Sequence, residues 1–153
     1  MSNTSLIKYK NKGFWINENF MQLLFNYLYI EVQKKEYVFV DKQDLLEELN
    51  EGVKGWYKGY FSLSWEEILK NTSDEQNLIK LLQNMKIILQ NKGLNISAAE
   101  LQSINVEDDT FNYLFSRKPF PIIELNKIID ALIEMLNGTW NYTNYRMEIN
   151  YQY

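Results

Sequence analysis

Apolar residues repeat with helical spacing over most of the chain. In residues 17–35, NENFMQLLFNYLYIEVQKK, they cover nearly the whole circumference of a helix. Such a pattern is typical of a helix buried in the middle of a bundle. Asn17 is a suitable N-cap, and Ile16 before it can contact Met21 in the next turn. The pattern therefore predicts a central helix over about 18–34.

Two more segments combine this spacing with start and stop signals. Residues 74–91 follow the capping box SDEQ at 73–76, in which side chains satisfy the first backbone N–H groups of a helix. Residues 121–137 begin at a proline, which suits the first turn of a helix, and end before Gly138. These segments predict the second and third long helices.

Shorter segments predict further helices. Residues 41–56 are acidic and Leu-rich, and their first aspartate can cap a helix. Capping boxes at 64–67 and 97–100 start two short helices, and one of the two aspartates at 108–109 starts another. We therefore predict a mainly α fold: a single compact helical domain over 1–153 with about six helices and a small β element.

The β element is expected at the C-terminus. In YRMEINYQY, residues 145–153, aromatic or apolar residues alternate strictly with polar ones, which is the period of a strand. We expect a strand over 144–153, either paired within the chain or exposed as an edge that accepts a partner's strand. Residues 1–13 are interpreted as an extended arm. Candidate partner strands within the chain are 5–9, 60–63 and 36–41, the last of which could equally be an extended linker.

Composition excludes several kinds of chemistry. The 153-residue chain has no histidine and no cysteine, which rules out Cys/His zinc sites, disulfides and His-dependent nucleophilic catalysis. No Gly-rich phosphate-binding loop is present. Two carboxylate pairs, at 41/44 and 108/109, could serve as acid and base or hold Mg²⁺, but a capping role explains them better. We therefore expect no enzyme activity, no cofactor and no metal.

Charge and aromatic residues concentrate in one stretch. Residues 41–75 hold nine acidic residues against four lysines and include GVKGWYKGYFSLSWEEIL at 52–69. Aromatic interface residues with acidic neighbours suit docking of a basic protein. The alternative is structural: the carboxylates lie on solvated helix faces and the tryptophans lie in the core. Trp56 or Trp65 is expected in the core. The candidate partner-binding residues are Asp44, Glu47, Glu48, Glu51, Tyr57, Tyr60, Glu66 and Glu67.

Overall charge and hydropathy bear on the partners and the cellular location of the chain. The formal net charge is −4, which argues against direct binding of a nucleic acid backbone. No apolar run approaches the ~20 residues of a membrane span, and the N-terminus lacks the apolar core of a signal peptide. We expect a cytoplasmic protein.

Three segments carry a family resemblance. They are WYKGYFSLSWEEIL after the acidic helix, LIKLLQNMKIILQNKGLNIS with the capped short helix that follows it, and a further helix pair toward the end. Together they resemble the small helical immunity proteins of bacterial contact-dependent growth inhibition systems, best over 45–105. The resemblance implies a stoichiometric inhibitor that binds the C-terminal domain of a cognate toxin, often a nuclease. A helical adaptor with an unrelated partner and a carboxylate-based enzyme remain as alternatives.

Overall fold

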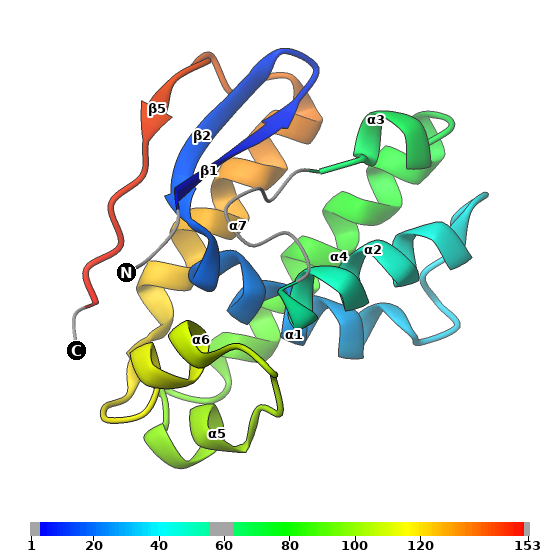
Figure 1. Cartoon of the computed structure of the whole chain (residues 1–153). Helices are drawn as coiled ribbons and strands as arrows, with labels where there is room; N and C mark the ends of the chain where they lie inside the picture. Colours follow the sequence, from blue (N-terminus) through cyan, green and yellow to red (C-terminus); the bar gives the residue numbers. More distant parts are fainter. Residues whose placement is uncertain (1–3, 56–62, 152–153) are drawn as a thin grey trace.

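Helix α1 (Glu18–Val32) lies in the middle of the fold (Figure 1). The computed structural model describes residues 4–55 and 63–151. Twelve of the 15 residues of α1 are buried. They are covered by four helices that contact α1, namely α2 (Lys42–Lys54), α4 (Thr72–Gln90), α6 (Asp109–Leu114) and α7 (Ile122–Asn137). The Asn17 side chain accepts the backbone N–H of Asn19 at 2.9 Å. The predicted central helix and its cap are therefore confirmed.

Within the described residues the chain forms seven helices instead of about six. The long helices agree with their predicted bounds to within two residues. Helices α4 and α7 lie side by side behind α1 (Figure 1), and one continuous cluster of buried apolar side chains joins all three. The other helices are α2 (Lys42–Lys54), α3 (Trp65–Ile68), α4 (Thr72–Gln90), α5 (Ala98–Ser103), α6 (Asp109–Leu114) and α7 (Ile122–Asn137).

The start signals located the helices better than they located the capping atoms. Helix α4 is capped by Asn71 and not by Ser73, since Asn71 Oδ1 accepts the N–H of Asp74 at 2.8 Å. Asp41 and Ser64 stand at the N-cap positions of α2 and α3, but neither side chain makes a capping hydrogen bond. The predicted caps of the next two helices are confirmed for Ser97 and Asp108.

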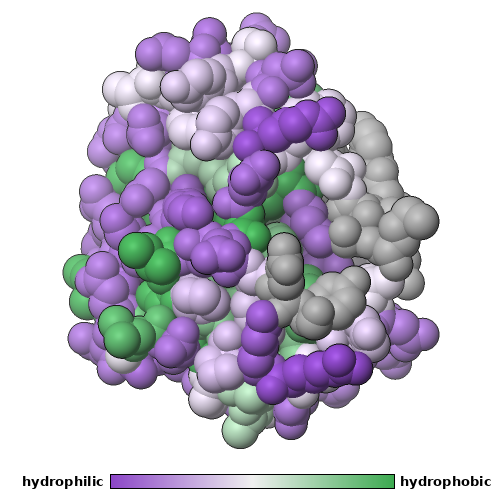
Figure 2. Space-filling view, turned by 90° about the vertical axis from the view of Figure 1, so that its left-hand side faces the viewer, coloured by the Kyte–Doolittle hydropathy of each residue, from purple (hydrophilic) through white to green (hydrophobic). Residues whose placement is uncertain are grey.

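Two small sheets complete the fold. In the larger sheet, β1 (Thr4–Tyr9) and β2 (Lys12–Asn17) form an antiparallel hairpin, and β5 (Tyr145–Arg146) pairs in parallel with β2. In the smaller sheet, β3 (Asn95–Ile96) pairs antiparallel with β4 (Phe120–Pro121). The larger sheet lies over α7 (Figure 1). Viewed from the side of β5, the surface is mostly hydrophilic, with apolar side chains visible between the polar ones (Figure 2).

The prediction of an extended arm over 1–13 is wrong. From Thr4 onward the segment is the first strand of the hairpin, and Ile7 and Tyr9 are buried in the core. Lys10 and Asn11 form the turn with φ of 49° and 66°. Two residues with positive φ match the twist of a tight hairpin turn, so this short connection holds β1 against β2.

The prediction of a strand over 144–153 is only partly right. Two residues, Tyr145 and Arg146, pair with a neighbour, and that neighbour is β2 and none of the three candidates. Residues 36–41 are a linker, and most of 60–63 lies outside the described residues. The alternation of apolar and polar residues matches an alternation of burial. Met147 and Ile149 are half-buried and Tyr151 is buried, while the residues between them are exposed.

A buried polar junction joins α1 to α2 and α6. Gln22 Nε2 donates to Asp108 Oδ2 at 3.0 Å, and Asn19 Nδ2 donates to Gln22 Oε1 at 2.5 Å. All three side chains are 1% exposed. Gly55 ends α2 directly over this junction, with φ of 77°. A Cβ on Gly55 would lie 2.7 Å from Gln22 Nε2 and 2.8 Å from Asp108 Oδ2.

We expect Gly55→Ala to lower the free energy of unfolding by about 1 kcal/mol more than Gly138→Ala, since a lost hydrogen bond costs about that much. Both glycines end a helix with φ of 77°, so both substitutions carry the same left-handed backbone strain. An added Cβ on Gly138 meets nothing within 4 Å. Chemical denaturation of the two variants measures the difference, and equal losses would contradict this view of the junction.

Candidate functional site

Two of the acidic residues in 41–75 join elements of the fold. Asp74 is 2% exposed, and its two carboxylate oxygens accept the N–H groups of Val40 and Lys70 at 3.1 and 2.9 Å. Glu75 accepts the Tyr9 hydroxyl at 2.6 Å. That hydrogen bond lowers the pKa of Glu75, while burial and the same bond raise the pKa of Tyr9. The pair therefore stays a carboxylate and a neutral phenol at neutral pH.

Glu48, one of the candidate binding residues, lies beneath the surface. Its side chain is 7% exposed, and Oε2 accepts the backbone N–H of Ser64 at 2.6 Å. Among the described residues, Glu48 Oε1 and Trp65 Nε1 are buried without a hydrogen-bond partner of normal geometry. The expectation that Glu48 offers its charge to a partner is corrected, because its carboxylate instead holds the start of α3 beside the middle of α2.

The environment of Glu48 favours its neutral form. Burial raises the pKa of the Glu48 carboxyl from 4.5 to about 7, because a charge loses its hydration in the interior. The hydrogen bonds of Ser64 and the nearby indole of Trp65 oppose this rise, and the charge of Glu51 adds to it. Glu48 is thus a buried group that titrates near neutral pH.

Four of the candidate carboxylates remain on the surface. We call them the acidic corner: Asp44 and Glu47 on α2 with Glu66 and Glu67 on α3. None of the four forms an ion pair with a described residue. Of the remaining candidates, Glu51 is half-buried, whereas Tyr57 and Tyr60 lie outside the described residues.

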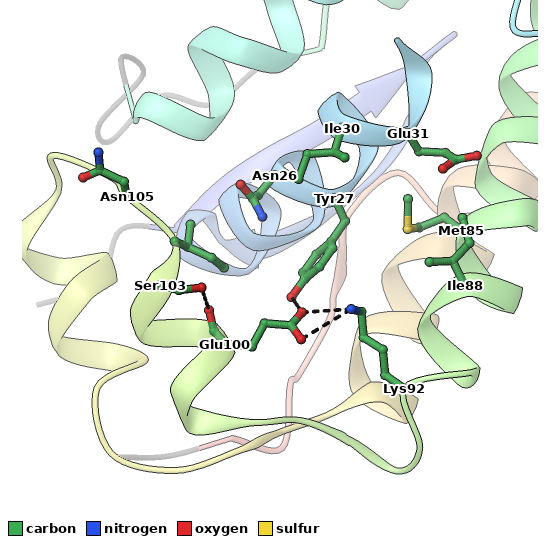
Figure 3. A pocket seen from close by; sticks show the side chains of 11 residues that line it. Asn26, Tyr27, Ile30, Glu31, Met85, Ile88, Lys92, Glu100, Ser103 and Asn105 are labelled. Carbon is green, nitrogen blue, oxygen red and sulfur yellow. Dashed lines mark hydrogen bonds and ion pairs between the residues drawn. The ribbon is translucent and has the colours of Figure 1, made fainter. Parts of the chain in front are cut away.

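A pocket of about 410 Å³ lies between α1, α4 and α5 (Figure 3). In it, Lys92 Nζ pairs with the Glu100 carboxylate at 3.1 Å, and the Tyr27 hydroxyl donates to the same carboxylate. Burial opposes ionisation of Glu100, but these two donors outweigh it and lower its pKa. The three groups satisfy one another, so they do not form an acid–base pair directed at a substrate. Sequence reasoning did not find this group, which joins residues 73 positions apart.

The carboxylate pairs weighed for catalysis have structural roles. Asp41 pairs with Lys70 at 3.4 Å, and Asp108 caps α6. Across residues 4–55 and 63–151, no group of three or more acidic side chains could hold a metal ion. A search of that same part of the chain finds no helix with the length and apolarity needed to cross a bilayer.

Comparison with known proteins yields no match: no protein-family model, curated protein or solved structure is similar to the chain. The resemblance to immunity proteins therefore rests on the three sequence segments alone.

Proposed function

We propose that the chain is an immunity protein that binds the cognate toxin domain of a contact-dependent growth inhibition system and blocks it stoichiometrically in the cytoplasm. The observation that supports this proposal is the acidic corner, where four exposed carboxylates on two contacting helices form no ion pair with any described residue. A surface of one sign attracts a partner of the other sign and speeds encounter. A nuclease that holds a phosphate backbone needs a basic surface, so it is a suitable partner.

The proposal is one of binding and not of turnover. The chain has no histidine or cysteine. In each of the two carboxylate pairs considered for catalysis, one member has a structural role: Asp108 caps a helix and Asp41 pairs with a lysine. An inhibitor needs only a complementary surface that covers the toxin. The acidic corner supplies charge for this, and its carboxylates are held on helices, which keeps their positions fixed before binding.

The direct test is co-expression with the C-terminal domain of the product of the adjacent gene, which the proposal expects to be the toxin. We expect a complex with one copy of each protein, and toxin activity that falls to zero when the two are equimolar. Absence of a complex at micromolar concentrations would overturn the proposal. Full protection at far less than one copy per toxin, with chemical alteration of the toxin or its product, would favour an enzyme instead.

Reversing charge in the acidic corner should slow association with that toxin domain. For the double variant Glu47→Lys/Glu66→Lys we expect the association rate constant to fall about tenfold at low salt, because steering by opposite charge is lost. Added salt should slow the wild type more than the variant. Stability should change little, since exposed charges contribute weakly. Stopped-flow binding and chemical denaturation measure the two quantities.

The matched control is Glu36→Lys/Glu107→Lys, which changes net charge by the same amount at exposed positions outside the acidic corner. It should leave the association rate near the wild-type value. Equal slowing by both double variants would show that only net charge matters, and the acidic corner would then have no special role.

A further inference from the structure

The C-terminal segment forms one wall of a second pocket, on α7. After β5 pairs with β2, the N–H of Met147 donates to Trp15 O at 2.9 Å, and the N–H of Asn150 donates to Glu124 Oε1 at 2.6 Å. These bonds hold the segment across α7. Between residues 145–148 and the exposed side of α7 lies a pocket of about 510 Å³. Strand β5, which contributes Tyr145 and Arg146 to its lining, is at the left of Figure 1.

Two of the five charged residues that line this pocket pair with residues outside it. Lys127 pairs with Glu124 at 2.8 Å, and Asp130 pairs with Lys86 at 2.7 Å. The remaining charged lining residues are Glu134, Glu148 and Arg146. All three are exposed, and none forms an ion pair with a described residue. The lining residues without an ion-pair partner therefore carry a net charge of −1, from two glutamates and one arginine.

Two aromatic residues, Trp140 and Tyr145, line the same pocket. Trp140 is fixed, because its indole N–H donates to Gly13 O at 2.9 Å, and its ring meets Tyr145 edge-on with centroids 5.5 Å apart. Tyr142 and Tyr145 contact each other, yet they remain 54% and 43% exposed. Aromatic faces attract cations, and exposed tyrosines are frequent energetic centres of interfaces.

We propose that this pocket binds a basic side chain, arginine or lysine, of a protein partner. The apolar stem of that side chain would lie along Tyr145, with its cation against Glu134 and Glu148. Negative charge and aromatic faces both favour this occupant, whereas they repel a phosphate or a carboxylate. The identity of the partner as a basic toxin domain rests on the proposed function, but the chemistry of the pocket does not.

Arg146 distinguishes this pocket from a general acidic surface by the direction in which its removal should change the affinity. Arg146 lines the same pocket, so we expect its charge to compete with an incoming cation for the two carboxylates. Removing this charge should therefore strengthen binding, although removing either neighbouring carboxylate should weaken it. Residues two positions apart, Arg146 and Glu148, are expected to act in opposite directions.

The test uses the full chain and two blocked tripeptides, acetyl-Gly-Arg-Gly-amide and acetyl-Gly-Gln-Gly-amide, followed by ¹H–¹⁵N NMR. We expect saturable shifts of the amides at 134 and 145–148 with the Arg peptide and none with the Gln peptide. Glu134→Gln/Glu148→Gln should raise Kd about tenfold, and Arg146→Gln should lower it a few fold, as expected for close charge pairs. Glu36→Gln, at an exposed position outside both this pocket and the acidic corner, should leave Kd unchanged.

Three results would overturn the proposal: equal shifts with the Gln peptide, weaker binding by Arg146→Gln, or shifts confined to the acidic corner. Failure of the proposed function looks different. If the Arg peptide binds the pocket but the toxin domain forms no complex, the pocket stands and the immunity role falls. If the toxin complex forms while the Arg peptide leaves 134 and 145–148 unshifted, the immunity role stands and the pocket falls.

Discussion

Replacing Glu48 with glutamine should make the protein less sensitive to pH between about 4.5 and 7, and relatively more stable above that window. Burial raises the pKa of the folded-state carboxyl to about 7 from the ordinary 4.5. The folded state thus binds more protons than the unfolded state between these values, so the wild type loses stability as pH rises through them. The loss amounts to at most about 3 kcal/mol, since one pKa unit corresponds to about 1.4 kcal/mol.

Glutamine stays neutral across this window and its side-chain oxygen can still accept the Ser64 N–H. The difference in free energy of unfolding between Glu48→Gln and the wild type should therefore grow in favour of the variant from pH 4.5 to pH 8. Urea denaturation at several pH values measures this. Glu47→Gln is the matched control, because Glu47 is the exposed neighbour on the same helix and should give a constant difference. Parallel pH profiles for Glu48→Gln and the wild type would rule out a buried Glu48 that titrates near pH 7.

The long helices could be predicted because local signals agree there. In 18–34 the apolar period, the cap and the absence of Pro and Gly all indicate one helix, and such agreement is the best guide to structure. The prediction that Trp56 or Trp65 lies in the core is met by Trp65, which is 0% exposed, whereas Trp56 lies outside the described residues. These features depend on neighbours within a few positions, which a single sequence displays.

The hairpin was missed because its turn is atypical. Tight two-residue turns usually carry glycine where φ is positive, but here Lys10 and Asn11 occupy those positions, and the glycine follows at 13. The strand period is visible in Ile7 and Tyr9, but the lysines at positions 8, 10 and 12 indicate an extended arm. The pairing of β5 with β2 joins residues about 130 positions apart, and no local pattern specifies such a partner.

In the acidic stretch 41–75, the number of charges does not reveal which carboxylates are buried. Glu48 lies between Leu45 and Leu49 on one face of α2, and Gly52 continues that face; all four residues are buried. Helical spacing i, i+3, i+4, i+7 marks these positions as the inner face. That spacing was the signal that could have separated Glu48 from Asp44 and Glu47, whose side chains are exposed. The hydrogen-bond donor of a buried carboxylate, such as the Ser64 N–H for Glu48, depends on tertiary contacts. The helical spacing of residues does not specify those contacts.

Gly13 joins three segments that meet in the larger sheet. It is buried in β2 opposite Lys8. Its N–H donates to Tyr142 O at 2.9 Å, and its carbonyl oxygen accepts the Trp140 indole N–H at 2.9 Å. A Cβ at this position would lie 2.2 Å from Ile7 O. That oxygen belongs to the backbone of β1, so a side-chain rotation cannot relieve the contact.

Gly13→Ala should therefore destabilise the protein by about 3–5 kcal/mol, combining overpacking against backbone with the loss of two hydrogen bonds of about 1 kcal/mol each. Thermal and urea denaturation measure the loss. The control is Lys12→Ala on the same strand, which removes a half-buried, surface-facing side chain and should change stability by less than about 0.5 kcal/mol. The two strands and the C-terminal segment should loosen together in Gly13→Ala, so hydrogen exchange should speed up at the β1–β2 amides and at Met147 while the α4 core stays protected. A Gly13→Ala variant as stable as the Lys12→Ala control would mean that the hairpin tolerates a side chain where the structure shows none can fit.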